Sequence, residues 1–160
     1  MVRGLERRRI FRDDEDRAEL LKRLAAVHER TGLIILAWAL LPNHFHLLVR
    51  SPRLQAGATS RAGLSTAMRQ LLTAYAGAFN RRHRCVGPLV QGRYKSVLVE
   101  EEPYLLELVR YLHLNPLRAG VVKNLVALDR YPWSGHSALM GRFVRPWQAT
   151  AEVLVRFGPT

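Results

Sequence analysis

The sequence predicts an α+β fold in which helices cover one antiparallel sheet. Two apolar segments joined by the turn signal Pro42-Asn43 indicate a β-hairpin, and segments with helical periodicity lie before and after it. The expected order is helix, strand, strand, helix, strand, helix. Because 160 residues, 48% of them hydrophobic, suffice for one core, we expect a single domain over residues 1–160.

Local signals mark each element. Asp13 and Asp14 are suited to cap a first helix, which Gly32 ends. Leu33–Leu41 is nearly all apolar and predicts a buried strand, and His44–Arg50 predicts its antiparallel partner. Five later elements are expected in this order: a loop over Ser51–Gly63, a helix over Leu64–Arg82, a strand over Tyr94–Val99, a helix over Glu101–Leu114 that Asn115-Pro116 ends, and a last helix within Trp147–Phe157.

The charge of the chain predicts a polyanionic partner. There are 25 basic and 13 acidic residues, a formal net charge of +12, and phosphate contacts made by such a surface release counterions. Only three of the basic residues are lysine, so a GC-rich genome that favours arginine is the alternative explanation. No apolar segment is long enough to span a bilayer or to serve as a secretory signal, and the single cysteine, Cys85, excludes an internal disulfide. We therefore expect a cytoplasmic protein that binds nucleic acid and no membrane.

The first candidate site is His44-Phe45-His46. Side chains at i and i+2 of a strand share a face, so both imidazoles are expected on one side and Phe45 in the core. Two neutral imidazoles side by side are suited to bind a divalent metal. The alternative is a polar edge of the hairpin on which two histidines alternate with apolar residues.

The second candidate site combines Tyr111 and Asn115, which are four residues apart and share a helix face outside the apolar stripe. A tyrosine beside a metal-bound phosphate can attack phosphorus and form a covalent phosphotyrosine, and the amide oxygen of Asn115 is suited to reach the same metal. Tyr104, seven residues earlier on the same flank, is the rival nucleophile. A tyrosine that merely packs and an asparagine that ends a helix are the ordinary alternative.

A third segment is basic and predicts contact with DNA. It combines positive charge for phosphates, an aromatic ring for stacking and a glycine for close approach, against the alternative of a solvated loop. The candidate DNA-binding residues are Arg81, Arg82, Arg84, Gln91, Arg93, Tyr94 and Lys95.

Four segments, in order, resemble the motifs of one protein family. They are LPNHFHLLV (Leu41–Val49), QGRYKS (Gln91–Ser96), RYLHLNPLRAG (Arg110–Gly120) and YPWS (Tyr131–Ser134). The chain resembles the REP-associated tyrosine transposases, transposase-like proteins of the HUH endonuclease superfamily. This resemblance implies a ferredoxin-like sheet and cleavage of single-stranded DNA beside hairpins formed by palindromic repeats.

The resemblance also assigns roles to individual residues. It implies Mg²⁺ or Mn²⁺ bound by His44 and His46, with Asn115 as a third ligand, and Tyr111 as the nucleophile that becomes linked to a 5′ phosphate. The expected partner is single-stranded, hairpin-forming DNA. Both a monomer and a homodimer are compatible with the sequence.

One departure from the family concerns the start of the chain. Members begin with a full strand that ends in an Arg-Gly motif, whereas only Met1–Gly4 corresponds to it here. We therefore expect a truncated first strand, and interpret it either as a natural start that lies upstream or as a decayed, weakly folded copy.

Two other functions stay open on the sequence. One is a catalytically silent module that binds DNA hairpins and derives from a transposase. The other is a basic RNA-associated protein without an active site. The joint presence of His44, His46, Tyr111 and Asn115 favours the enzyme, because a pure binding module has no need of all four.

Overall fold

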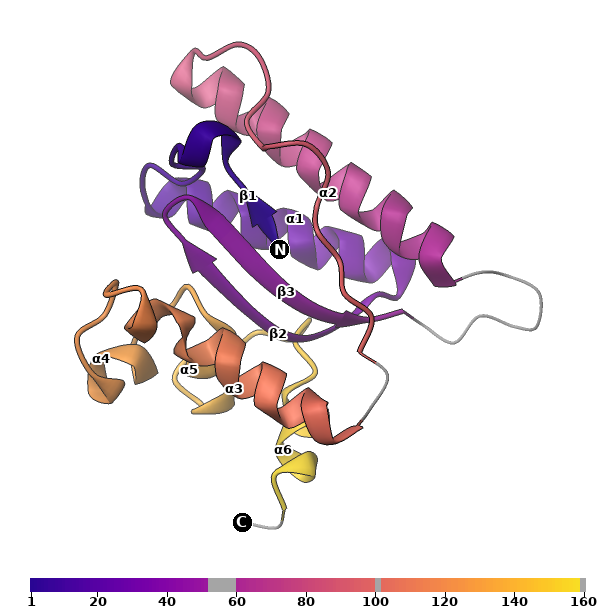
Figure 1. The fold of residues 1–160 in the computed structure, drawn as a ribbon, viewed down its shortest axis with the longest axis vertical. Coiled ribbons are helices and arrows are strands. Elements are labelled where there is room, and N and C mark those ends of the chain that lie inside the picture. Colours follow the sequence, from indigo (N-terminus) through magenta and orange to yellow (C-terminus); the bar gives the residue numbers. More distant parts are fainter. Residues whose placement is uncertain (52–59, 100–101, 159–160) are drawn as a thin grey trace.

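The computed structural model describes residues 1–51, 60–99 and 102–158, and it has an antiparallel sheet between two layers of helices (Figure 1). The strands β1 (Val2–Arg3), β2 (Ile34–Leu41) and β3 (His44–Arg50) are ordered β1-β3-β2. Helices α1 (Asp14–Thr31) and α2 (Ser60–His83) cover one face of the sheet, and α3 (Glu102–Arg118) covers the other (Figure 1). The predicted α+β class is confirmed.

Helix α1 begins and ends where its capping residues predict. The side chain of Asp13 accepts a hydrogen bond from the backbone N–H of Asp16 at 3.1 Å, which satisfies a free donor of the first turn. Gly32 adopts a left-handed conformation, with φ 68°, and its N–H donates to the carbonyl of His28.

The β2–β3 hairpin fixes which side chains reach each face. Leu41 pairs with His44 and Trp38 pairs with Leu47 across the two strands. Phe45 is only 1% exposed and belongs to the core under α1 and α2. Because neighbouring strand residues alternate, His44 and His46 lie on the other face, which α3 covers.

Two apolar clusters stabilise these layers. The larger lies between the sheet and helices α1 and α2, and the smaller lies between the sheet and α3. A register shift between Ile35 and Ala37 turns Leu36 and Ala37 toward the smaller cluster, so the hairpin contributes to both cores. The residues of the smaller cluster are Leu36, Ala37, Leu48, Val109, Leu112 and Val153.

Two predicted helix boundaries are wrong. Helix α2 begins at Ser60, so residues 60–63 of the predicted loop are helical, while residues 52–59 of that loop lie outside the described residues. Helix α3 continues through Pro116 to Arg118 instead of ending at Leu114. The side-chain Nδ2 of Asn115 donates to the carbonyl of Tyr111 at 3.4 Å, and the main-chain N–H of Ala119 donates to the carbonyl of Asn115 at 2.8 Å. These bonds continue the turn around the proline, which itself lacks a donor.

The predicted strand over Tyr94–Val99 is also wrong. The ladder-like contacts of this region lie before and at its start, where Val90 bridges Gly4, the N–H of Gln91 donates to the carbonyl of Arg3 at 2.9 Å, and the N–H of Lys95 donates to the carbonyl of Met1 at 3.0 Å. Val97 and Leu98 are 89% and 81% exposed, so their β-forming side chains have no surface to pack against. The segment runs beside β1, in the place of a fourth strand, without forming one.

The first strand is short, as predicted, but it is paired. Val2 lies opposite Phe45 and Arg3 lies opposite His44 on β3. β1 is the edge strand of the three-stranded sheet, and residues 90–95 run along its other side, so the chain surrounds β1 as in a ferredoxin-like order.

Residues after α3 cover the outer edge of β2. Three short helices follow: α4 (Leu125–Asp129), α5 (Gly135–Leu139) and α6 (Thr150–Arg156), the last within the predicted range. The carbonyl of Trp133 accepts from the N–H of Leu40, and the N–H of Ala149 donates to the carbonyl of Ile35, both at 2.9 Å. The side chain of Trp38 donates to Gln148 at 2.8 Å. Within the described ranges, none of the helices combines the length and apolar character that a bilayer crossing requires.

Candidate active site

His44 and His46 lie side by side on the face of the sheet that α3 covers. Their ring centroids are 5.1 Å apart and the two rings are nearly perpendicular. Both side chains are half-buried, and Nδ1 of His44 is 2.7 Å from Oδ1 of Asn43 in the hairpin turn. The shared face predicted from the i, i+2 spacing is therefore present.

The surroundings of the two imidazoles favour their neutral forms. Burial, followed by the charges of His44, the amino terminus and Arg3, lowers the pKa of His46 to about 4. Burial and the charge of Arg3 also lower the pKa of His44. A neutral imidazole has a free nitrogen lone pair, which is the form that binds a metal ion.

Helix α3 places Tyr111 beside these histidines. The ring of Tyr111 is 6.4 Å from that of His46, at 87° to it, and the side chain is 45% exposed. Tyr104, the rival nucleophile, is 57% exposed and makes no ring contact with either histidine. Seven helical residues span about 10 Å along an axis, so only one of the two tyrosines lies next to His46.

Asn115 lies one turn beyond Tyr111, and its amide nitrogen donates to the Tyr111 carbonyl at 3.4 Å. Because Nδ2 of Asn115 donates to this carbonyl, the side-chain oxygen Oδ1 is the atom that can bind a metal ion or a hydrogen-bond donor. No hydrogen bond joins Asn115 to His44 or His46, so the structure places Tyr111 beside the two histidines and Asn115 one turn farther along α3.

The side chains of His44 and His46 supply part of the ligand shell that a divalent cation requires. Two neutral imidazoles supply two ligands, and an amide oxygen or a phosphate oxygen of the substrate is suited to complete the shell. Across the described part of the chain, no group of three or more His, Cys, Asp or Glu residues is placed to hold a metal ion. A metal held by His44 and His46 would therefore need further ligands beyond the described His, Cys, Asp and Glu side chains.

Two arginines at this site were not identified from the sequence. Arg3 lies opposite His44 in the strand register, which places it on the same face, and its charge lowers the pKa of both histidines. The guanidinium of Arg118 lies 5.3 Å from the centre of the Tyr111 ring. Among the described carboxylates, none forms an ion pair with either arginine. Residues seven apart on one helix lie on the same face, so the spacing of Tyr111 and Arg118 is the feature of the sequence that could have indicated this contact.

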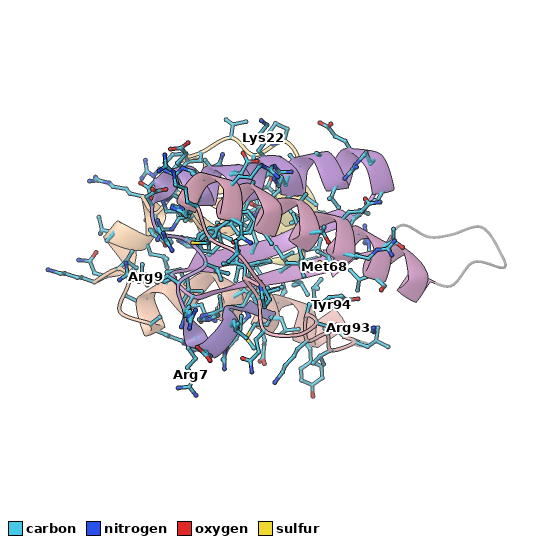
Figure 2. All side chains as sticks on the ribbon, turned by 90° about the horizontal axis from the view of Figure 1, so that it is seen from above. Arg7, Arg9, Lys22, Met68, Arg93 and Tyr94 are labelled. Atoms are coloured by element: carbon cyan, nitrogen blue, oxygen red, sulfur yellow. The ribbon has the colours of Figure 1, made fainter. Side chains whose placement is uncertain are left out.

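Most of the predicted DNA-binding residues lie on or before the segment beside β1. Arg81, Arg84, Gln91, Arg93 and Lys95 are exposed, and Tyr94 packs partly against the larger core. The N–H of Gln91 donates to the carbonyl of Arg3 at 2.9 Å, which fixes the segment next to the histidine-bearing sheet. Arg7 and Arg93 project from one side of the molecule, and Lys22 projects from the opposite side (Figure 2).

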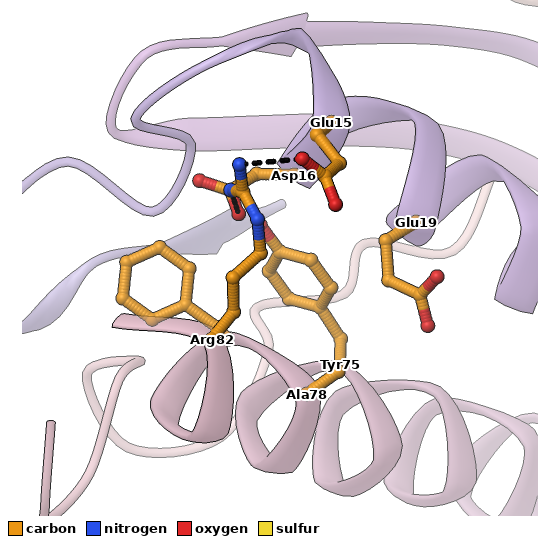
Figure 3. A pocket seen from close by; sticks show the side chains of 7 residues that line it. Glu15, Asp16, Glu19, Tyr75, Ala78 and Arg82 are labelled. Atoms are coloured by element: carbon orange, nitrogen blue, oxygen red, sulfur yellow. Dashed lines mark hydrogen bonds and ion pairs between the residues drawn. The ribbon is translucent and has the colours of Figure 1, made fainter. Parts of the chain in front are cut away.

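Arg82 is the exception, because carboxylates of α1 hold its guanidinium. It pairs with Asp13 and Glu15 at 2.7 Å and with Asp16 at 2.6 Å. Asp16, 2% exposed, also bonds the imidazole of His83 at 2.8 Å. Glu15, Asp16 and Arg82 line a cavity of about 110 Å³ between α1 and α2 (Figure 3). Arg82 therefore joins two helices and has little charge to offer to phosphate.

Replacement of Asp13 by asparagine tests this ion-pair network. The hydrogen bonds from Arg82 and Asp16 lower the pKa of Asp13 to about 2, so its contribution to stability is complete above pH 3.8 and is lost as the pH falls through about 2. Asp13→Asn keeps an acceptor for the helix cap but removes the charge. We expect a lower urea midpoint at pH 7 and a smaller further decrease between pH 4 and pH 2.5 than in the wild type.

The control for this experiment is Asp14→Asn, because among the described residues Asp14 pairs with Arg17 alone, at the exposed start of α1. Equal urea midpoints for Asp13→Asn and the wild type at both pH values would contradict a stabilising role for the network.

Comparison with known proteins shows the family and the fold of the chain. The family model described as "Transposase IS200 like" matches residues 1–115. No curated protein matches the chain. A solved structure described as a REP-associated tyrosine transposase bound to a REP hairpin is similar in fold, with a TM-score of 0.69 and 20% sequence identity. The similarity covers 92% of this chain and 80% of that chain.

The matched region contains β1, the β2–β3 hairpin, helices α1 and α2, and α3 as far as Asn115. It therefore includes both histidines and the tyrosine of the candidate site. The family resemblance read from the four motifs is confirmed, and the chain belongs to the IS200-like transposases.

Proposed function

We propose that this chain is a metal-dependent DNA endonuclease and strand transferase that uses Tyr111 as its single nucleophile. The observation that carries the proposal is the position of the Tyr111 ring, 6.4 Å from His46 across the sheet–helix interface. A half-exposed phenol beside two neutral imidazoles is suited to attack a phosphate that a cation holds there.

The proposed substrate is single-stranded DNA next to a hairpin formed by a palindromic repeat. The solved structure of similar fold is described as bound to a REP hairpin, and the family is one of transposases, which supports this substrate class. The positive charges of Arg84, Arg93 and Lys95, before and on the segment beside β1, supply contacts for the phosphate backbone of single-stranded DNA.

Each residue has a distinct role in the proposed reaction. His44 and His46, with Asn115 as a third donor, would hold Mg²⁺ or Mn²⁺, which when bound supplies Lewis acidity at the scissile phosphate. The phenol oxygen of Tyr111 forms a bond to phosphorus and gives up its proton. The bond from phosphorus to the 3′ oxygen breaks, and that oxygen leaves as a hydroxyl after it takes up a proton. Strand transfer is the reverse attack by a 3′ hydroxyl on the phosphotyrosine. Arg3 and Arg118 supply positive charge next to the reacting phosphate.

The experiment that tests the proposal is covalent trapping. Wild-type protein is incubated with a hairpin oligonucleotide that carries a single-stranded 5′ extension and a label on the fragment that would stay attached, with Mn²⁺ or with EDTA. A labelled band of higher mass on a denaturing gel, present with Mn²⁺ and absent with EDTA, is expected. Tight hairpin binding without an adduct under any divalent metal would reject the enzyme and favour the silent binding module.

The affinity for DNA should fall steeply with salt, and the segment beside β1 should account for part of the slope. Each phosphate contact that is lost reduces the slope of log K against log salt concentration by about one unit. We therefore expect the triple replacement of Arg84, Arg93 and Lys95 by glutamine to reduce it by up to about three units, measured by fluorescence anisotropy with a labelled hairpin.

Arg82→Gln is the matched control for this measurement, because carboxylates of α1 already neutralise that guanidinium. It should leave the slope unchanged while it lowers the urea midpoint. An unchanged slope in the triple variant would show that the charge of the segment reflects composition alone.

A further inference from the structure

Asn43 links His44 to the segment that follows β1. Its Oδ1 lies 2.7 Å from Nδ1 of His44, and its Nδ2 donates to the main-chain carbonyl of Arg7 at 3.3 Å. Its own main-chain carbonyl accepts from the N–H of Gly4 at 2.8 Å. The asparagine is thus fixed on both its side-chain and main-chain atoms.

These contacts determine where His44 carries its hydrogen. A main-chain carbonyl can only accept, so the amide nitrogen of Asn43 must be the group that faces Arg7. The amide oxygen then faces His44, and because this oxygen also only accepts, Nδ1 of His44 must be the donor. A neutral imidazole has a hydrogen on only one of its two ring nitrogens, so the free lone pair of His44 lies on Nε2.

The path of the chain after β1 makes this arrangement possible. A Cβ on Gly4 would lie 2.2 Å from the carbonyl oxygen of Arg8, so only glycine permits the chain to fold back so tightly. Glu6 and Arg7 have φ angles of 51° and 60°, in the left-handed region. This tight turn directs the carbonyl of Arg7 at Asn43, so the Arg-Gly motif at the start of the chain supports the site from a distance.

We propose that Asn43 is a positioning residue that holds His44 in the Nδ1–H tautomer and so reserves Nε2 as the metal-binding atom. The use of Nε2 as a ligand rests on the proposed function, whereas the tautomer does not. A ligand histidine whose other nitrogen donates to an oxygen is held in orientation, and loss of such a partner lowers metal affinity by about 10- to 100-fold.

The tautomer is tested first, on metal-free wild-type protein near pH 7.5, where both imidazoles are neutral. Long-range ¹H–¹⁵N NMR distinguishes a protonated Nδ1 from a protonated Nε2, and His44→Gln identifies the signals of His44. We expect the Nδ1–H form in the wild type and a mixture of the two forms in Asn43→Ala. A dominant Nε2–H form in the wild type would overturn the proposal.

The second test compares two substitutions by their Mn²⁺ affinity, measured without DNA from the electron paramagnetic resonance signal of free Mn²⁺. Asn43→Ala should bind Mn²⁺ about 10- to 100-fold more weakly. Asn43→Asp keeps the acceptor for Nδ1–H but loses the donor to Arg7, so it should stay within about threefold of the wild type.

The aspartate variant separates positioning from a purely structural role in the turn. If Asn43 served only to hold the turn, both variants would lose the bond to Arg7 and would weaken Mn²⁺ binding equally, which would overturn the proposal. Wild-type affinity in Asn43→Ala would overturn it as well. Thermal midpoints of both variants show whether either has unfolded, and the tautomer measurement stands even if the wild type binds no Mn²⁺, a result that would reject the metal site of the proposed function.

Discussion

Tyr111→Phe should abolish the covalent protein–DNA adduct while it leaves hairpin affinity nearly unchanged. The substitution removes one oxygen and keeps the ring that contacts His46 and Arg118, so packing is preserved. No other atom at this position can form the bond to phosphorus, so the rate of adduct formation should fall by more than about 1,000-fold. Covalent trapping on a denaturing gel and anisotropy with the same labelled hairpin measure the two quantities in parallel.

Tyr104→Phe is the matched control, because Tyr104 lies on the same helix and is also exposed. It should form the adduct as the wild type does. Loss of the adduct in Tyr104→Phe alone would move the nucleophile one heptad back along α3 and reject the assignment of Tyr111.

His44→Ala and His46→Ala should each reduce the rate of adduct formation by more than about 100-fold. Loss of a hydrogen-bond partner of a metal ligand already lowers metal affinity by about 10- to 100-fold, and loss of the ligand itself should have a larger effect. Hairpin affinity should persist, since the phosphate contacts assigned to Arg84, Arg93 and Lys95 lie on another segment. The measurement is the initial rate of adduct formation at several Mn²⁺ concentrations. A defect that higher Mn²⁺ partly corrects is expected for a ligand and is not expected for a general loss of folding.

His28→Gln is the control for removal of an imidazole elsewhere. His28 is half-buried at the end of α1 and contacts the carbonyl of Leu33 through Nδ1, away from the candidate site. It should retain the wild-type rate. Wild-type rates in both His44→Ala and His46→Ala would show that neither imidazole takes part in the reaction.

The elements that carry the candidate site could be predicted from the sequence because their signals are local. Asp13 and Gly32 cap the two ends of α1, and Pro42-Asn43 limits the hairpin turn to two residues. Strand alternation then places both histidines on one face. The proximity of Tyr111 to His46 required the family resemblance as well, since no local pattern states which face of the sheet α3 covers.

The wrong predictions arise where tertiary contacts override local preference. Pro116 predicts a helix end, yet hydrogen bonds of Asn115 and Ala119 continue the turn around it. The β-formers of Tyr94–Val99 predict a strand, but β1, beside them, offers only two strand residues for pairing. Arg82 could not be separated from its basic neighbours by sequence, because its three carboxylate partners lie 66 to 69 residues earlier in the chain.

The outer edge of β2 has a consequence for how the protein can be divided. The family match ends at residue 115, but the groups that bond to the main chain of β2 at its outer edge come from Tyr131, Trp133 and Ala149. Seven of the eight residues of β2 are buried, so a fragment cut after the matched region would display an apolar strand with unpaired N–H and C=O groups. Such an edge is a template for intermolecular pairing and aggregation. The described residues after the family match thus cover an edge of the hairpin that would otherwise be open to such pairing.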